Sequence, residues 1–213
     1  MKITHAIVDL DGTLIVSLHY WQKVYEDFLI ERGNEPEKDL GPTVSKWNTK
    51  EINEYIKARY NVPESEQDMT AAITEKMKEL YFNIKELKPG AKEYLQKLKA
   101  QGVKLCLATG SPAILAEGAL KSSGVFDLFE FIITCEQVGK NKTSPAIYEY
   151  CTKRLGADID TTWVFEDAPS AAKTAKSIGL NVVGVADEYH KEEGKRELLR
   201  WCDKYIESFC ELL

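Results

Sequence analysis

The feature that most constrains the fold of this chain is an apolar segment that runs directly into two acidic residues. Ile3 to Val8 has the character of a buried strand, and Asp9-Leu10-Asp11-Gly12-Thr13 follows at once. In an open parallel sheet, ligands bind beyond the carboxyl ends of the strands. Two carboxylates at such a place are costly to desolvate without a cation. The segment therefore predicts a ligand or metal site at the end of a first, buried strand.

Other origins of this acidic pair fit less well. A solvated turn would suit Asp-Gly alone, but not two acids directly after a buried strand. A calcium loop of the EF-hand type needs acids at positions one, three and five, glycine at six and helices on both sides. Here Gly12 comes too early and the preceding element is a strand. A phospho-receiver domain would carry its phosphorylated aspartate after a later strand.

From about residue 88 onward, apolar strand patterns alternate with helical ones. This alternation indicates a mostly parallel sheet covered by helices. The expected strands are Val103–Thr109, Phe131–Thr134, Thr162–Glu166 and Asn181–Val185. The expected helices begin near Pro89, Pro112, Pro145 and Pro169, and a long amphipathic helix, apolar at Leu198, Trp201, Cys202, Tyr205, Phe209 and Leu212, is expected from about Glu192 onward.

Between the first strand and this region, the chain has a helical pattern only. Apolar residues recur at helical spacing over Tyr20–Arg32, Thr49–Tyr60 and Glu66–Lys85. The block is best interpreted as an insertion after strand one. We therefore expect an α/β fold, a Rossmann-like parallel sheet core (residues 1–15 and 88–213) with an inserted α-helical bundle cap (residues 16–87).

A second acidic pair follows the strand Thr162–Glu166. Glu166 and Asp167 stand just before Ala168-Pro169, where a helix begins. Taken alone, Asp167 suits a helix N-cap. Hard oxygen ligands from two neighbouring strand ends, however, are typical of a magnesium site.

Two further signals are weaker. Thr109-Gly110-Ser111-Pro112 places a hydroxyl and exposed N–H groups between a strand and a helix, which suits a phosphate oxygen or an ordinary turn. Lys140 and Lys142 lie in the loop before the helix at Pro145, where lysines are usually only solvated.

Taken in chain order, the acidic pair at 9 and 11, the turn at Thr109, the loop lysines and the acidic pair at 166 and 167 resemble the haloacid dehalogenase superfamily. The resemblance covers nearly the whole chain. Asp-Leu-Asp-Gly-Thr-Leu is highly specific, and Phe-Glu-Asp-Ala-Pro at 165–169 adds to it. The helical insertion matches members with a small helical cap. The resemblance implies a Mg²⁺-dependent phosphatase that hydrolyses a small phosphorylated metabolite, a sugar, polyol or nucleoside monophosphate, through an aspartyl-phosphate intermediate.

The resemblance also implies roles for the acidic residues. Asp9 takes the position of the nucleophile. Asp11 takes that of the general acid and base, with its main-chain carbonyl on the metal. Asp167 takes that of a further metal ligand, with Glu166 in support, so that Asp9, Asp11, Glu166 and Asp167 together are expected to form the Mg²⁺ site.

The remaining motif residues are expected to bind phosphate. Thr109 takes the position of the phosphate-binding hydroxyl, with the Gly110 N–H beside it. The superfamily lysine usually precedes the final proline of Lys-Pro-x-Pro by three residues. Lys142-Thr143-Ser144-Pro145 keeps this register but lacks the first proline, so we favour Lys142 over Lys140.

A phosphosugar mutase of the β-phosphoglucomutase kind is the main alternative on the same scaffold. Mutases of this kind carry a histidine on the helix after the first motif, and His19 would bind substrate if it holds that place. Aligning it requires a two-residue gap, and a surface histidine beside Tyr20 and Trp21 is the other interpretation.

Other functions on this scaffold have less support from the sequence. A dehalogenase would lack the second acid, Asp11. A phosphonate hydrolase needs a Schiff-base lysine from the cap, which has several lysines. A non-catalytic binding protein would be expected to have lost a nucleophile or a metal ligand, and all these positions are filled.

Composition limits the partners. Lys and Arg number 28 and Asp and Glu 34, for a net charge of −6, and no long basic run suggests nucleic-acid binding. No apolar stretch is long enough to span a bilayer, and the acids at 9 and 11 come too early for a signal-peptide core.

The five cysteines lack CxxC spacing, which favours reduced thiols. We expect a cytoplasmic monomer or weak homo-oligomer with a small phosphate ester as its partner.

Overall fold

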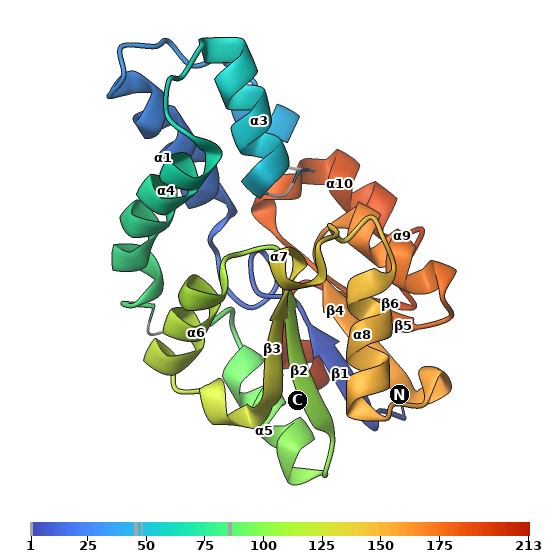
Figure 1. Ribbon diagram of the computed structural model, residues 1–213. Coiled ribbons are helices and arrows are strands. Elements are labelled where there is room, and N and C mark those ends of the chain that lie inside the picture. Colours follow the sequence, from blue (N-terminus) through green and yellow to red (C-terminus); the bar gives the residue numbers. More distant parts are fainter. Residues whose placement is uncertain (1, 45–46, 48, 85–86) are drawn as a thin grey trace.

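The computed structural model describes residues 2–44, 47, 49–84 and 87–213, and its centre is a six-stranded parallel sheet (Figure 1). The strands lie in the order β3-β2-β1-β4-β5-β6, and every neighbouring pair is parallel. Their bounds are β1 His5–Val8, β2 Lys104–Thr109, β3 Phe129–Thr134, β4 Thr162–Glu166, β5 Asn181–Val185 and β6 Lys204–Ile206.

Helices cover both faces of the sheet because successive strand residues point to opposite sides. In β1, for example, Ala6 and Val8 pack on one face and Ile7 on the other. The first face is covered by α5 (Ala91–Ala100) and α6 (Ala113–Ser122). The second is covered by α8 (Ala146–Leu155), α9 (Pro169–Ser177) and α10 (Lys191–Leu198).

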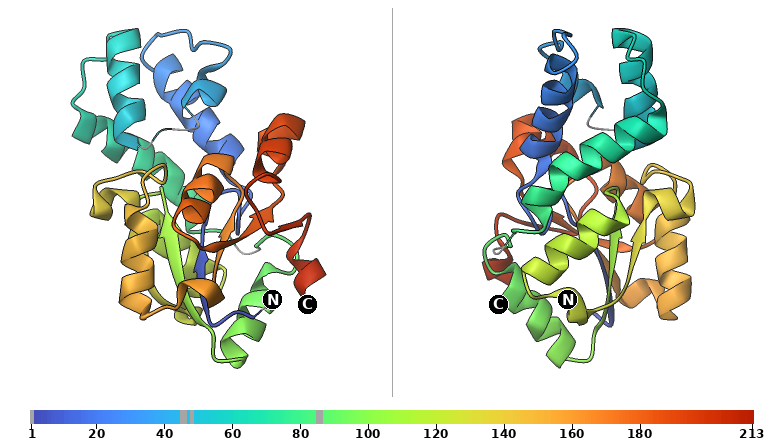
Figure 2. Two further views of the ribbon diagram at one scale, coloured as in Figure 1. Left: turned by 90° about the vertical axis from the view of Figure 1, so that its right-hand side faces the viewer. Right: turned by 60° about the vertical axis from the view of Figure 1, so that its left-hand side comes forward.

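The inserted helices lie together above the carboxyl ends of the strands (Figures 1 and 2). They are α1 (Leu18–Ile30), α2 (Leu40–Val44), α3 (Thr49–Tyr60) and α4 (Glu66–Tyr81). Each of the longer ones buries a stripe at helical spacing, such as Met69, Ile73, Met77 and Tyr81 in α4. We keep 16–87 as the proposed cap and 1–15 with 88–213 as the proposed core.

The predicted fold class, a Rossmann-like parallel sheet with a helical insertion, is confirmed. The helix predicted over Glu66–Lys85 ends at Tyr81, and Lys85 lies outside the described residues. Short elements complete the chain: η1 Phe126–Leu128, α7 Cys135–Val138, η2 Ile159–Thr161, η3 Glu188–His190 and η4 Phe209–Leu212. Within the described part of the chain, none of the helices combines the length and the apolar character that crossing a membrane requires.

The prediction of one long helix at the C-terminus is wrong. Helix α10 ends at Leu198, and the chain then adds strand β6 to the sheet before η4. The apolar residues of this segment serve both faces: Leu198 packs on the second face, whereas Phe209 and Leu212 pack on the first. One straight helix cannot reach both sides of a sheet, so the chain crosses its edge as a strand.

The topology places the acidic motifs at one edge of the sheet. Strand β1 is central, with β2 on one side and β4 on the other, and the chain order reverses at this point. The Asp9 N–H donates to Phe165 O at 3.0 Å, so the pairing with β4 continues past the end of β1. Such a switch point is where open α/β sheets bind ligands.

Candidate active site

The turn after β1 is fixed by its own backbone and by Lys88. Gly12 has φ of +80°, and a side chain there would overlap the Asp167 carboxyl, so glycine is required on both grounds. The Lys88 ammonium group donates to the carbonyl oxygens of Gly12 and Ala186 and pairs with Asp187 at 2.8 Å. This lysine thereby ties the turn after β1 to the segment after β5.

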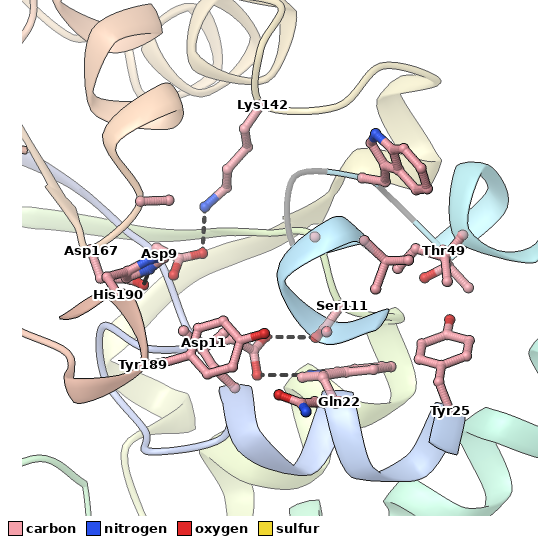
Figure 3. A pocket seen from close by; sticks show the side chains of 18 of the residues that line it. Asp9, Asp11, Gln22, Tyr25, Thr49, Ser111, Lys142, Asp167, Tyr189 and His190 are labelled. Carbon is pink, nitrogen blue, oxygen red and sulfur yellow. Dashed lines mark hydrogen bonds and ion pairs between the residues drawn. The ribbon is translucent and has the colours of Figure 1, made fainter. Parts of the chain in front are cut away.

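Three carboxylates and one ammonium group meet where β1 and β4 end, and Figure 3 shows Asp9, Asp167 and Lys142 of this cluster. Carboxylate oxygens of Asp9, Glu166 and Asp167 lie within 4.8 Å of one another, and all three residues are buried. The Lys142 ammonium group pairs with Asp9 and, at 2.5 Å, with Glu166. Buried anions outnumber this lysine by three to one, so the cluster is suited to a further cation.

Burial and mutual repulsion govern protonation in this cluster. Burial first, and then the neighbouring Glu166, raises the pKa of Asp9 well above its usual range. Burial also raises the pKa of Glu166. For Lys142, burial lowers the pKa, but Asp9 and Glu166 more than reverse this, so the net shift is upward and the lysine is charged.

Asp167 has partners of its own. The Thr13 hydroxyl donates to Oδ1 at 2.8 Å, and His190 Nε2 lies 2.6 Å from Oδ2. Burial alone would raise the pKa of Asp167, but the hydrogen bonds from His190 and Thr13 lower it overall. Burial alone would lower the pKa of His190, but Asp167 raises it. Asp167 is therefore held as a carboxylate beside Asp9.

The Asp11 carboxyl group points away from the other three, towards the cap. Its Oδ1 accepts hydrogen bonds from Ser17 at 2.6 Å, from Trp21 at 3.3 Å and from Tyr81. Its Oδ2 accepts one from Ser111 at 2.6 Å. Asp11 thus sits where the cap joins the core, and the predicted metal contact through its main-chain carbonyl stays a prediction.

Thr109 lies at the end of β2, fully buried beneath the cavity. Its hydroxyl accepts a hydrogen bond from the Ser111 N–H at 3.0 Å and lies 3.5 Å from Asp11 Oδ2. Gly110 and Ser111 line the cavity directly. The strand end therefore offers backbone and hydroxyl donors close to Asp11.

The loop after β3 carries Lys142 into the cluster. Thr134 caps the short helix α7 by accepting a hydrogen bond from Gln137 N at 3.2 Å, and Gly139 ends the helix with φ of +72°. The chain then turns so that Lys142 reaches Asp9, whereas Lys140 is exposed. Of the two lysines, the structure brings only Lys142 to the acids.

His19 does not join the site. It lies on the exposed side of α1, with its ring 3.8 Å from that of Tyr20, whereas Leu18, Trp21, Gln22 and Tyr25 of the same helix line the cavity. The helical period turns His19 away from this face. This position matches the surface interpretation, and a substrate contact by His19 stays an untested prediction.

Among the groups that touch the predicted residues, sequence reasoning missed His190, Tyr81 and Ser17. His190 follows β5 by five residues, and the only signal for it was its position after a strand end in the sheet. Tyr81 and Ser17, near the two ends of the cap, reach Asp11 only because the inserted block folds back. No local spacing in the sequence indicates that contact.

A cavity of about 210 Å³ lies between the acidic cluster and the cap. Asp9, Asp11, Lys142, Glu166, Asp167 and His190 form its charged end. Ligand pockets usually measure about 300–1,000 Å³. This cavity falls below that range, which favours a small molecule as its ligand.

Comparison with known proteins identifies the family. A model of the haloacid dehalogenase-like hydrolases matches residues 3–179. The chain belongs to this family. Both the resemblance and the predicted enzyme class, a hydrolase of this superfamily, are confirmed.

Several named relatives align over most of the chain. A validoxylamine A 7′-phosphate phosphatase of Streptomyces hygroscopicus subsp. limoneus is 28% identical, covering 88% of this chain and 87% of that protein. Hexitol phosphatase B of Escherichia coli K12 is 27% identical, covering 86% and 84%. A probable pseudouridine-5′-phosphatase of Drosophila melanogaster is 28% identical, covering 90% and 85%.

Solved structures share the fold. CbbY of Rhodobacter sphaeroides, crystallised with phosphate, superposes with a TM-score of 0.87 at 21% identity, covering 99% of this chain and 96% of that one. A β-phosphoglucomutase of Clostridium difficile superposes with a TM-score of 0.82 at 22% identity, covering 99% and 93%. At these identities the likeness speaks for the fold alone.

Proposed function

We propose that this hydrolase is a Mg²⁺-dependent phosphatase that releases inorganic phosphate from a sugar, polyol or nucleoside monophosphate through an aspartyl-phosphate on Asp9. The observation that carries the proposal is the buried Asp9 carboxylate at the end of the central strand, contacted by Lys142 and flanked by Glu166 and Asp167. The names of the relatives, which refer to validoxylamine A 7′-phosphate, hexitols and pseudouridine, support this substrate class.

The acidic cluster fits a divalent cation. Its donors are hard carboxylate oxygens, which Mg²⁺ prefers, and their negative charge exceeds what Lys142 supplies. Asp9 and Asp167 would hold the ion, with Glu166 in support. When bound, Mg²⁺ reduces the repulsion between a carboxylate nucleophile and a phosphate dianion.

In the proposed first step, an Asp9 carboxylate oxygen attacks phosphorus and the bond from phosphorus to the ester oxygen breaks. Lys142 stabilises the negative charge on the transferring group as a pre-positioned donor, and we assign the Thr109 hydroxyl and the Gly110 N–H as further donors. Protonated Asp11 donates its proton to the leaving oxygen. The products are the alcohol and a mixed anhydride on Asp9.

In the second step, water attacks phosphorus and the anhydride bond to Asp9 breaks. Asp11, now a carboxylate, takes a proton from that water, and the free Asp9 carboxylate is restored. Ser17, Trp21, Tyr81 and Ser111 all donate to Asp11 in this structure, so its orientation depends on both cap and core.

Removal of the metal is expected to abolish activity. EDTA should stop phosphate release and Mg²⁺ should restore it, whereas Ca²⁺ should restore it poorly because its coordination shell is larger and looser. Asp167→Ala should weaken Mg²⁺ binding by about 100-fold and Glu166→Ala by about 10-fold. Calorimetric titration of each variant with Mg²⁺ measures the two constants, and the reverse ranking would contradict the ligand assignment.

An assay of phosphate release from a panel of phosphorylated metabolites tests the proposal as a whole. Mg²⁺-dependent turnover identifies a phosphatase. Binding of these esters without release would instead favour a non-catalytic binding protein on the same fold.

The protein is expected to hydrolyse its best substrate and not to isomerise β-glucose 1-phosphate. His19 lies outside the cavity lining, so His19→Ala should leave kcat/KM unchanged. Glucose 6-phosphate and inorganic phosphate are measured together, with catalytic glucose 1,6-bisphosphate present. Faster formation of glucose 6-phosphate than of phosphate would favour the mutase.

A further inference from the structure

The cavity has a second end, built from the cap, that the proposed chemistry does not use. Its lining is mostly apolar and aromatic, with two further polar side chains, Gln22 and Thr49. The apolar and aromatic contributors are Leu18, Trp21, Tyr25, Val44, Trp47 and Ile52. In the part of the cap that the structure describes, none of the lining residues is charged.

Tyr25 is the exceptional residue of this end. Its side chain is 1% exposed, and its hydroxyl has no hydrogen-bond partner among the described residues. Figure 3 shows it rising from α1 with the hydroxyl directed into the cavity, on the side where Thr49 lies. A buried polar group without a partner is destabilising, so phenylalanine would serve the fold better at this position.

Gln22 is fixed by its neighbours, in contrast to Tyr25. Its Nε2 donates to Glu26 at 2.7 Å. Its amide also packs on Gly41 so closely that a side chain at position 41 would overlap it. Gln22 is therefore a preformed part of the cap end of the cavity.

We propose that Tyr25 is the residue that recognises the organic part of the substrate, by a hydrogen bond from its hydroxyl to a hydroxyl or carbonyl oxygen of an uncharged ring or chain. That ring or chain would pack against Trp21 and Trp47 while the phosphate meets Asp9 and Lys142. The inference rests on the proposed function and narrows its substrates to monophosphates that carry no second ionised group.

The charge distribution of the cavity supports this assignment. All charged side chains among its described lining residues belong to the core end. A second phosphate or a carboxylate placed against the cap would lose its hydration without gaining a partner. Burial also raises the pKa of Tyr25, which keeps the hydroxyl protonated and able to donate.

The test compares Tyr25→Phe with Tyr20→Phe, a matched change on the same helix at an exposed position outside the cavity lining. The probes are sorbitol 6-phosphate, uridine 5′-monophosphate and phenyl phosphate, whose organic part lacks a polar oxygen. Tyr25→Phe should melt at the same or a higher temperature than wild type. It should lose about 10- to 100-fold in kcat/KM for whichever hydroxyl-bearing probe is best, and nothing for phenyl phosphate. Tyr20→Phe should change neither.

Equal losses on phenyl phosphate, or no loss on any probe, would overturn the role of Tyr25. A wild-type preference for phosphoglycolate or fructose 1,6-bisphosphate over both uncharged probes would overturn the substrate class. Lys46 precedes Trp47 in the sequence and lies outside the described residues. Lys46→Ala is therefore run in parallel, to test whether this lysine causes any preference for a substrate with a second ionised group.

Failure of the proposed function gives a different result, namely no phosphate release from any probe, phenyl phosphate included. Calorimetric binding of sorbitol 6-phosphate and uridine 5′-monophosphate to wild type and Tyr25→Phe then decides the inference on its own. Weaker binding to the variant by about 10-fold or more supports it, and equal binding or no binding overturns it.

Discussion

Asp9→Asn is expected to fold like the wild-type protein and to lose turnover by roughly 10⁴-fold or more, the scale on which covalent enzymes lose activity without their nucleophile. The amide has nearly the shape of the carboxylate, but its oxygen is a poor nucleophile and its nitrogen has no free lone pair. Lys142 keeps Glu166 as a partner in this variant, so the loop that carries it stays in place.

Phosphate release from the best substrate, with Mg²⁺ present, measures this effect. Asp160→Asn is the matched control because Asp160 is exposed and precedes β4, at the opposite end of that strand from the acidic cluster. It should retain wild-type turnover. Activity of Asp9→Asn within about tenfold of wild type would exclude a covalent step on Asp9.

The stability of the same variant should depend on pH in a defined direction. Burial and Glu166 raise the pKa of Asp9 in the folded chain above its unfolded value of about 3.9. The stabilisation linked to Asp9 is therefore present below the unfolded pKa and is lost as the pH rises through the folded one. Without metal, the melting temperature of Asp9→Asn relative to wild type should thus increase from acid to neutral pH.

Local patterns were enough to predict strands β1 to β5 and most helices. Each of these five strands was an apolar run, and helices α5, α8 and α9 had proline near their start. The prediction of a long helix from about Glu192 was wrong because the apolar residues of the C-terminal segment also fit a helical period. Phe209 and Leu212 decide between helix and strand there, because they pack on the opposite face of the sheet from Leu198. That requirement depends on the tertiary fold and leaves no local signal.

The candidate site likewise contains residues that local patterns predict and contacts that depend on the tertiary fold. Asp9, Thr109 and Asp167 could be predicted as candidates because each stands at or just after a strand end, where the parallel topology brings residues together. The contacts of Tyr81 and Ser17 with Asp11 join the two ends of an inserted block. Sequence spacing predicts that the block is inserted, but not which of its side chains face the acid.

The position of Asp11 links the two parts of the proposed enzyme. Three of its hydrogen-bond donors come from residues 17–81, and Ser111 comes from the core. A proton donor held from both sides is oriented only when cap and core are together. The proposed chemistry at phosphorus is thereby coupled to the end of the cavity that we propose to contact the organic part of the substrate.

Lys142→Ala is expected to lower kcat/KM by about 10²–10³-fold, the usual effect of deleting one donor that stabilises transition-state charge. Its ammonium group is the cation that the structure places against Asp9 and Glu166. The variant should also be less stable, by about 3 kcal/mol in the absence of metal, because the buried Asp9 and Glu166 carboxylates then lack that partner. Added Mg²⁺ should recover part of this stability but not the activity.

Lys140→Ala is the matched control, since Lys140 is exposed on the same loop. It should change neither kcat/KM nor stability. Phosphate-release kinetics and thermal unfolding of both variants, with and without Mg²⁺, measure the two effects. If Lys140→Ala proved the more damaging change, the loop would have to place its lysines two residues out of the register described, and the phosphate-binding role would pass to Lys140.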